Sequence, residues 1–144
     1  MKALNILLLL ILTSVSLNTY GAERTEIFRS FIWKFFKYPE FQAKRVQFPV
    51  ERIRYVDKPM SFSPSFEKEQ ITQKDWVPIK GPSHFECESN CSDLLIYDNF
   101  DRKFRPSGQR VLSIEGVENG INSAYYFRLI DEKWFLVKIA WLDD

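Results

Sequence analysis

The C-terminal third of the chain carries a hydrophobic pattern that few folds can satisfy. Apolar and polar residues alternate over 124–130 and again over 134–142, which is typical of half-buried β-strands. A short apolar run over 111–114 predicts a strand before them. Asn119-Gly120 predicts a tight hairpin turn, because a type I′ turn needs positive φ at both central positions. With a second turn predicted at 131–133, the pattern indicates three consecutive antiparallel strands.

One face of these strands is aromatic and needs a cover. We expect this face to consist of Phe135, Val137, Ile139 and Trp141 on the last strand and Tyr125, Phe127 and Leu129 on the strand before it. Residues 25–37 supply the cover, because their apolar side chains recur at helical spacing. Thr25 is expected to cap this helix, and Phe31 and Phe35 are expected to share a core with Phe127, Val137 and Ile139. Pro39 ends the helix and opens a second, short one through Gln42.

The middle of the chain is less regular. Alternation over 45–55 predicts a strand, and Pro49 predicts that this strand lies at an edge or breaks there. Residues 66–76 have weak helical character, and 94–97 predicts a short strand. Pro, Gly and Ser cluster in the loops between these segments, with no repeat and no interdomain linker. We therefore expect residues 22–144 to form a single α+β domain.

The first 21 residues are predicted to be a secretory signal peptide. Lys2 precedes an apolar run over 6–12, which is followed by small and polar residues up to Gly21. The run is shorter than the roughly 20 apolar residues that span a bilayer, so an uncleaved anchor is the lesser alternative. We expect a periplasmic or secreted protein that does not insert into the membrane after cleavage.

Charge gives little support to a nucleic-acid partner. The chain has 20 basic and 19 acidic residues, and removal of the signal peptide takes Lys2 with it, so the mature chain is neutral. A neutral domain has no general attraction for nucleic acid or anionic lipid. Basic residues are concentrated over 34–58 and acidic residues over 86–101. These are either two solvated surfaces or, in the basic case, a patch for an anionic ligand.

Cys87 and Cys91 are the two cysteines of the chain. In a secreted protein an even number of cysteines favours a disulfide, and the three residues between them fit a tight turn. A metal site with His84 is an alternative that would have only three ligands, and free thiols are a further one. We expect a disulfide, no metal and no cofactor.

Short motifs of packing residues carry a resemblance to a known family. The segment Phe41-Gln42-x-x-Arg45-Val46-x-Phe48-Pro49 follows a Phe-rich helix, and Tyr126-Phe127 and Trp134-Phe135-Leu136 lie in the closing hairpin. This arrangement resembles an uncharacterised family of secreted bacterial proteins with a nuclear transport factor 2-like fold. The resemblance implies N-terminal helices packed on a curved antiparallel sheet, often cone-like with a pocket at its mouth. It implies no established activity, because such folds serve enzymes, ligand binders and interaction modules alike.

The catalytic motifs that sequences most often reveal are missing from the chain. It has no Gly-rich phosphate loop, no nucleophile elbow and no zinc-protease motif, and it has one histidine. We therefore predict a non-catalytic module that binds a small molecule or an envelope protein. One alternative is an acid–base enzyme of the isomerase or dehydratase type, with Asp57 near Tyr55 or Glu115 with Tyr126 as candidate groups. Another is an inhibitor or immunity-type partner of a secreted protein. No catalytic residue is assigned.

Tyr55, Trp76 and Arg128 are the candidate ligand-binding residues. Tyr55 and Trp76 each combine a flat apolar face with a polar tip, which is common at recognition surfaces. Arg128 falls on the strand face opposite Phe127 and is predicted to lie at the rim of the cone. The alternative is that the aromatic residues fill the core and that Arg128 pairs with a neighbouring acid.

Overall fold

The computed structural model describes residues 25–56, 65–81, 92–103, 105–116 and 122–141. Its helices are α1 (Phe28–Lys37), α2 (Pro39–Ala43) and the 3-10 turn η1 (Gln73–Asp75). Its strands are β1 (Val46–Val56), β2 (Ser65–Ile71), β3 (Ser92–Tyr97), β4 (Gln109–Gly116), β5 (Asn122–Ile130) and β6 (Lys133–Trp141). The predicted signal peptide and the predicted Cys87–Cys91 disulfide lie outside the described residues. Among the described residues, no helix is long and apolar enough to cross a membrane.

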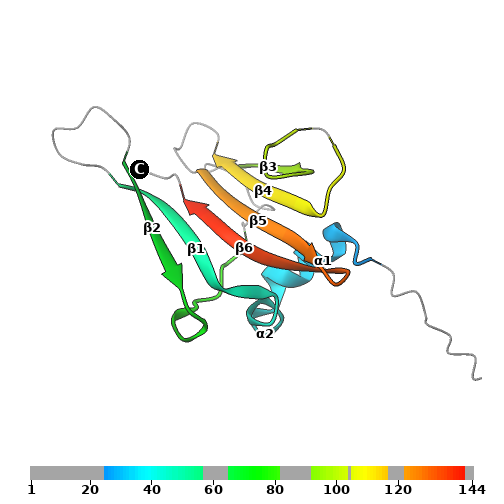
Figure 1. The fold of residues 1–144 in the computed structure, drawn as a ribbon, viewed down its shortest axis with the longest axis horizontal. Helices are drawn as coiled ribbons and strands as arrows, with labels where there is room; N and C mark the ends of the chain where they lie inside the picture. The colour runs from blue at the N-terminus through cyan, green and yellow to red at the C-terminus, as the bar shows by residue number, and fades with distance from the viewer. Residues whose placement is uncertain (1–24, 57–64, 82–91, 104, 117–121, 142–144) are drawn as a thin grey trace, which may run out of the picture.

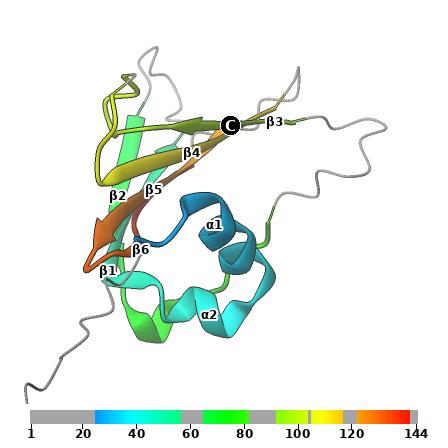
Figure 2. The same ribbon diagram turned by 90° about the vertical axis from the view of Figure 1, so that its right-hand side faces the viewer.

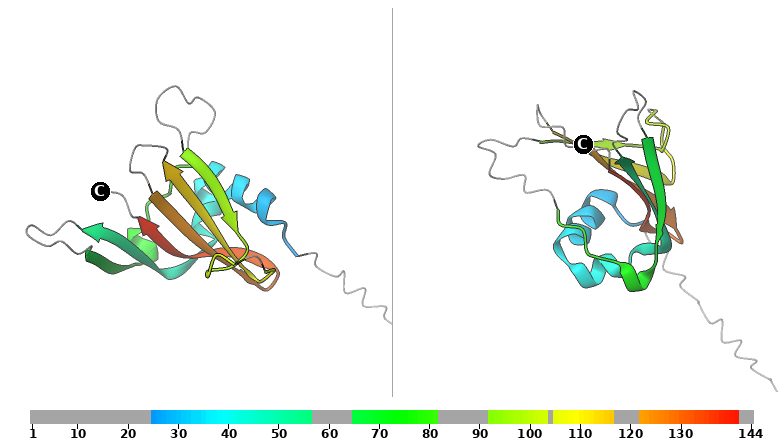
Figure 3. Two further views of the ribbon diagram at one scale, coloured as in Figure 1. Left: turned by 90° about the horizontal axis from the view of Figure 1, so that it is seen from above. Right: turned by 90° about the vertical axis from the view of Figure 1, so that its left-hand side faces the viewer.

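The six strands form one curved sheet in the order β2-β1-β6-β5-β4-β3. Both helices lie on its concave side (Figures 1 and 2), and β1 and β2 extend past α1 (Figure 3). The predicted α+β class is confirmed, but the sheet is mixed, because β1 pairs parallel with β6 while all other neighbours are antiparallel. The parallel pair arises because α2 delivers β1 beside the start of β6, where Leu136 N donates to Arg45 O at 2.8 Å.

The core lies between α1 and the concave face. Phe31, Phe35 and Phe127 are fully buried, and Ile139 is 1% exposed in the same cluster. The rings of Phe35 and Phe127 meet edge to face, with centroids 5.4 Å apart, which is a favourable arrangement for aromatic pairs. These four members of the predicted core are confirmed.

The prediction that Phe135 and Val137 face the core is wrong. Trp134 and Leu136 are buried instead, at 3% and 0% exposure. The pairing of β5 with β6 shifts between Tyr126 and Phe127, which leaves one extra residue in β6 at Val137. A bulge of this kind reverses the alternation on one side of it. From Ile139 onward, the residues predicted to face the core do so. Before Val137 the two faces of β6 are exchanged relative to the prediction.

One further prediction for the middle of the chain is wrong, and another is confirmed in part. Residues 65–71 form β2, which pairs with β1 in register along its whole length, so the weak helical pattern gives only the short turn η1. The prediction for Pro49 is confirmed in part. β1 is a continuous strand, but β2 pairs with it only from Val50 onward, so Pro49 lies at a local edge of β1. It falls where the β1–β6 register shifts, between Val46 and Glu51. A proline is accommodated there because its nitrogen is not needed for the ladder.

The predicted Thr25 cap is wrong as well. α1 begins at Phe28 without a side-chain cap. Its start is held by Glu26, whose carboxylate accepts both guanidinium nitrogens of Arg45 at 2.8 and 3.1 Å and the Trp134 backbone N–H at 3.0 Å. The Trp134 indole in turn donates to Glu26 O at 2.8 Å. This network ties the helix to the first residues of β6.

Candidate functional site

A pocket of about 390 Å³ lies on the helix-facing side of the sheet, between residues 75–80 and strands β1, β2 and β6. We call it the Trp76 pocket. Its apolar wall comprises Ile71, Trp76, Val77, Pro78, Ile79, Ile139 and Trp141, and its charged residues are Arg52, Asp75 and Lys80. Its volume is within the range of about 300–1,000 Å³ that is usual for small-molecule sites.

Gln42 positions the outer wall of the Trp76 pocket. Its side-chain Nε2 donates to Phe35 O and Ile79 O, both at 3.0 Å, and its Oε1 accepts the Ile79 N–H at 2.6 Å. The side chain is 1% exposed. One buried amide therefore joins the end of α1 to residue 79, and it satisfies both backbone groups of Ile79 in place of a neighbouring strand.

Trp76 presents the one buried side-chain polar atom in this pocket that lacks a partner among the described residues. Its indole Nε1 is buried and has no hydrogen-bond acceptor there. The ring is held by Phe48, edge to face, with centroids 5.6 Å apart. A buried donor without an acceptor costs about 1–3 kcal/mol, so a hydrogen-bond acceptor in the pocket would recover that free energy.

Three charged groups near the pocket, Arg52, Arg54 and Glu69, are engaged with one another. Arg52 Nε donates to Glu69 Oε1, Arg54 Nε lies 3.4 Å from the same oxygen, and the Arg52 guanidinium lies 4.8 Å from the Trp141 ring centroid. The hydrogen bond from Arg52 and the charges of both arginines hold the pKa of the Glu69 carboxyl below its ordinary value, outweighing the opposite effect of burial. Glu69 is therefore ionised and occupied, which makes it a weak candidate for a general base.

Asp75 is the carboxylate that lines the Trp76 pocket. It is solvent-exposed, and its Oδ2 accepts a hydrogen bond from Thr72 Oγ1 at 2.6 Å within the same turn. This contact closes the turn around η1, so the arrangement of Asp75 is explained by local structure. Among the described residues no group of three His, Cys, Asp or Glu side chains is placed to hold a metal.

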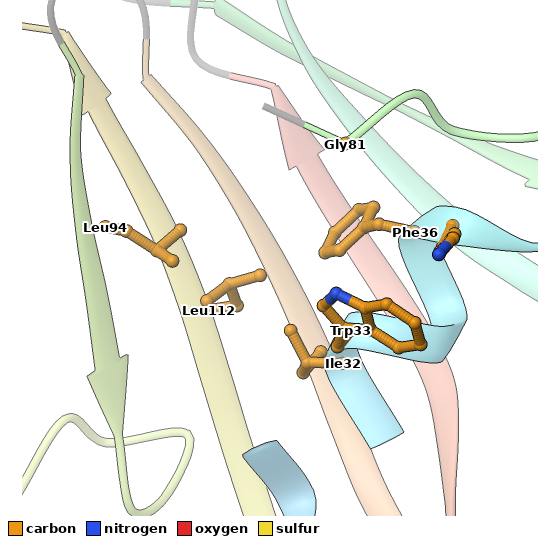
Figure 4. A pocket seen from close by; sticks show the side chains of 7 residues that line it. Ile32, Trp33, Phe36, Gly81, Leu94 and Leu112 are labelled. Atoms are coloured by element: carbon orange, nitrogen blue, oxygen red, sulfur yellow. The ribbon is translucent and has the colours of Figure 1, made fainter. Parts of the chain in front are cut away.

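A second pocket, of about 300 Å³, lies on the other side of α1. We call it the α1 groove. Figure 4 shows Ile32, Trp33 and Phe36 reaching from α1 toward Leu94 on β3 and Leu112 on β4, with Gly81 beside Phe36. A Cβ at position 81 would lie 2.9 Å from Phe36 Cβ, so the close approach here requires glycine. Lys37 is the charged residue of its lining.

The structure does not bring the three predicted ligand residues together. Trp76 lines a pocket on the concave face, as described above. Tyr55 lies on the opposite face of β1 from Arg52, with its ring 6.1 Å from that of Phe66 on β2. Arg128 is exposed on the outer face of β5, where it borders a hollow of about 410 Å³, and its guanidinium lies 5.8 Å from the Phe100 ring centroid.

Of the two pairs considered for catalysis, Glu115 and Tyr126 are not brought together. Tyr126 pairs with Val111, whereas Glu115 pairs with Asn122, four positions further along β4. At a rise of about 3.3 Å per residue the two lie roughly 13 Å apart. Glu115 accepts a hydrogen bond from Ser113 at 3.0 Å. Asp57 lies outside the described residues.

Sequence reasoning missed the α1 groove and the role of Gln42. Trp33 and Lys37 are four residues apart, at the edge of the apolar stripe of α1, and this spacing is the signal that would have placed them together. No comparable signal exists for Gln42, because its partner is a backbone group 37 positions away.

Comparison with solved structures identifies the class of fold. An NTF2-like protein from Bacteroides fragilis NCTC 9343 matches with a TM-score of 0.58 and 19% identity, over 85% of this chain and 49% of that chain. A cystatin-like protein from Bacteroides caccae ATCC 43185 matches with a TM-score of 0.50 and 20% identity, over 82% of this chain and 77% of that chain. The chain thus spans about half the length of the first structure.

The chain therefore has an NTF2-like α+β fold, as its sequence resemblance implied. No protein-family profile and no curated protein sequence matches it. The residues that carried the resemblance have structural roles, since Gln42 holds Ile79 and Arg45 holds Glu26. They account for the fold and leave the ligand to be inferred from the pockets.

Proposed function

We propose that this protein is a non-catalytic binding module that holds a small molecule in the Trp76 pocket. The observation that carries the proposal is the buried Nε1–H of Trp76, which has no acceptor among the described residues and lies in a pocket of about 390 Å³ with a largely apolar wall. An apolar body fills such a wall, and a single acceptor atom satisfies the indole. Pockets of this composition bind through shape and a few placed polar contacts.

The charges around the pocket define the ligand further. Arg52 and Arg54 share the single carboxylate of Glu69, and Lys80 and Asp75 lie in the lining. The sum of these five groups is one positive charge. The proposed ligand is therefore a flat, largely apolar molecule that carries an acceptor or a negative group, such as an aromatic acid.

Catalysis has less support from this site. The carboxylate in the lining, Asp75, is exposed and bonded within its own turn, and Glu69 is engaged by two arginines. Acid–base chemistry needs a base with a pKa near the working pH, whereas the pKa of Glu69 is lowered. The proposed site of action is the cell envelope or the exterior, which rests on the predicted signal peptide at residues 1–21.

The indole N–H resonances of the four tryptophans test the proposal. The probe is 1-anilinonaphthalene-8-sulfonate, a flat aromatic anion, which is titrated into protein labelled with 15N at the indole nitrogens. The Trp76 resonance, assigned by its loss in Trp76→Phe, should shift as its N–H gains an acceptor. The Trp134 resonance is an internal control, because this indole already donates to Glu26 O at 2.8 Å.

Trp76→Phe should keep the fold, lose the hydrogen bond and weaken probe binding by about fivefold to tenfold, as expected for a bond worth about 1 kcal/mol. Trp33→Phe is the matched control and should leave this affinity unchanged. Equal affinity in the wild type and in Trp76→Phe, with no shift of the Trp76 resonance, would contradict the proposed site.

A further inference from the structure

The α1 groove has the composition of a site for a hydrocarbon chain, and this inference is independent of the Trp76 pocket. Its walls come from one side of α1 and from the strand pair β3–β4 (Figure 4). Trp33 is 57% exposed and Leu94 is 41% exposed, although both are large and apolar. Large apolar side chains that converge on one opening mark a binding site more often than isolated exposed ones do.

The two edge strands of the sheet differ in the residues at their centres. β3 and β2 are the two edges of the sheet. β2 carries Glu67, Lys68 and Glu69 in its middle, as protected edges usually do. The middle of β3 is instead Leu94, Leu95 and Ile96, which are 41%, 39% and 49% exposed. The apolar surface of the α1 groove therefore continues along the groove side of β3 through Leu94 and Ile96, at the one edge that lacks charges among its central residues.

Lys37 supplies the polar end of the groove. Its ammonium lies 4.2 Å from the Trp33 ring centroid and 5.4 Å from that of Tyr38. Within the described part of the chain, no carboxylate forms an ion pair with it. Cation–π contacts orient the ammonium without neutralising its charge. A positive charge is thus held beside Trp33, at the margin of an apolar cavity.

We propose that the α1 groove binds a single-chain anionic amphiphile, with the hydrocarbon tail between α1 and β3–β4 and a carboxylate paired with Lys37. Charge complementarity selects this occupant, because the described residues of the lining include one cation and no anion. An apolar tail alone would leave Lys37 unpaired, and a cationic amphiphile would be repelled. The cavity of about 300 Å³ is small enough that one chain, and not a folded partner, fills it.

Decanoate is the probe, and decanol and hexanoate are the matched ligands, each used below micelle formation. Binding to the full protein is measured by isothermal titration calorimetry and by the chemical shift of the Trp33 indole N–H. Decanoate should bind more tightly than decanol, which lacks the charge, and than hexanoate, which lacks four methylene groups. Lys37→Gln should weaken decanoate binding by about fivefold, as expected for an exposed charge pair, and leave decanol unchanged.

Matched variants test the roles of the cation and of the apolar wall separately. Lys34→Gln removes a cation from the same helical turn but outside the groove lining, and it should leave decanoate binding unchanged. Leu94→Asp should abolish binding, whereas Leu95→Asp should not, because the two residues have similar exposure but lie on opposite faces of β3. Circular dichroism verifies that each variant is folded. Trp76→Phe should bind decanoate normally, which separates this proposal from the proposed function.

Several outcomes would overturn the proposal. Equal affinity for decanoate and decanol, in the wild type and in Lys37→Gln alike, would show a purely apolar cavity with no role for the charge. Decanoate binding that persists in Leu94→Asp would place the ligand elsewhere. A dimer in sedimentation that Leu94→Asp dissociates would show that a second copy of the chain covers the groove.

Discussion

Gln42 on α2 and Ile79, 37 positions later, are joined by two hydrogen bonds, at 3.0 and 2.6 Å, between one side-chain amide and the backbone C=O and N–H of one residue. The amide thus provides the hydrogen bonds that a neighbouring strand would otherwise provide to Ile79. Its third bond, to Phe35 O at 3.0 Å, connects the same group to α1. One buried side chain therefore anchors the wall of the Trp76 pocket at Ile79.

Gln42→Ala should destabilise the protein by about 2–4 kcal/mol, because it leaves buried groups of Phe35 and Ile79 without partners. Chemical denaturation measures the change. Gln47→Ala, at an exposed position of β1, is the control and should have an effect below about 0.5 kcal/mol. Gln42→Ala should also lose affinity for the naphthalene sulfonate probe. Full retention of both stability and affinity would show that Gln42 does not hold the wall.

Phe35→Ala should cost about 3–5 kcal/mol, since the ring is fully buried against Phe127 and its loss leaves a cavity. Thermal or chemical unfolding checks this value. Phe66→Ala is the comparison, because Phe66 is 51% exposed and its removal should cost less than about 1 kcal/mol. Similar melting of Phe35→Ala and the wild type would refute the assigned core.

Arg45→Met should destabilise by about 2–3 kcal/mol, because it leaves the Glu26 carboxylate without its bidentate partner beside Trp134. Lys44→Met is the adjacent exposed control. A double-mutant cycle with Glu26→Gln measures the interaction directly. We expect a coupling energy above about 1 kcal/mol, and additive effects would contradict the network.

Glu132→Gly should stabilise the protein by about 1 kcal/mol. Asp131 and Glu132 form the two-residue turn between β5 and β6 with φ of 45° and 61°, the left-handed region in which glycine is favoured and a Cβ is strained. Glu132→Ala is the control, because alanine loses the charge but keeps the Cβ, so its stability should stay near that of the wild type. A higher melting temperature for glycine alone identifies the backbone as the cause.

The pH dependence of stability should contain a contribution from Glu69. Its pKa is below the ordinary value of 4.5 in the folded protein, owing to the hydrogen bond from Arg52 and the charges of both arginines. The stabilisation is therefore complete above that ordinary value and is lost as the pH falls through the lowered one. Glu69→Gln should lessen the decline in melting temperature between pH 5 and strongly acidic pH. Parallel curves for variant and wild type would contradict this assignment.

The local pattern of the chain was sufficient to predict most elements. α1, α2, β1 and the four strands β3 to β6 all lie where the spacing of apolar residues indicated, because helices and strands bury one stripe or face at a characteristic period. The aromatic face of β5 and its helical cover were predicted for the same reason. The signal peptide, the Cys87–Cys91 disulfide and the envelope location stay predictions.

The tertiary structure alone decided the features that depend on distant partners. The bulge at Val137 inverted one end of β6, β2 formed because β1 offered it an edge, and Gln42 found Ile79 across the pocket. Tyr55 and Arg128 were separated from Trp76 because alternation places them on the outer face of the sheet. Periodicity is a property of neighbouring residues, so the sequence determines which faces are apolar. Which faces pack together, and where a pocket remains between them, depends on contacts between residues that are far apart in the sequence.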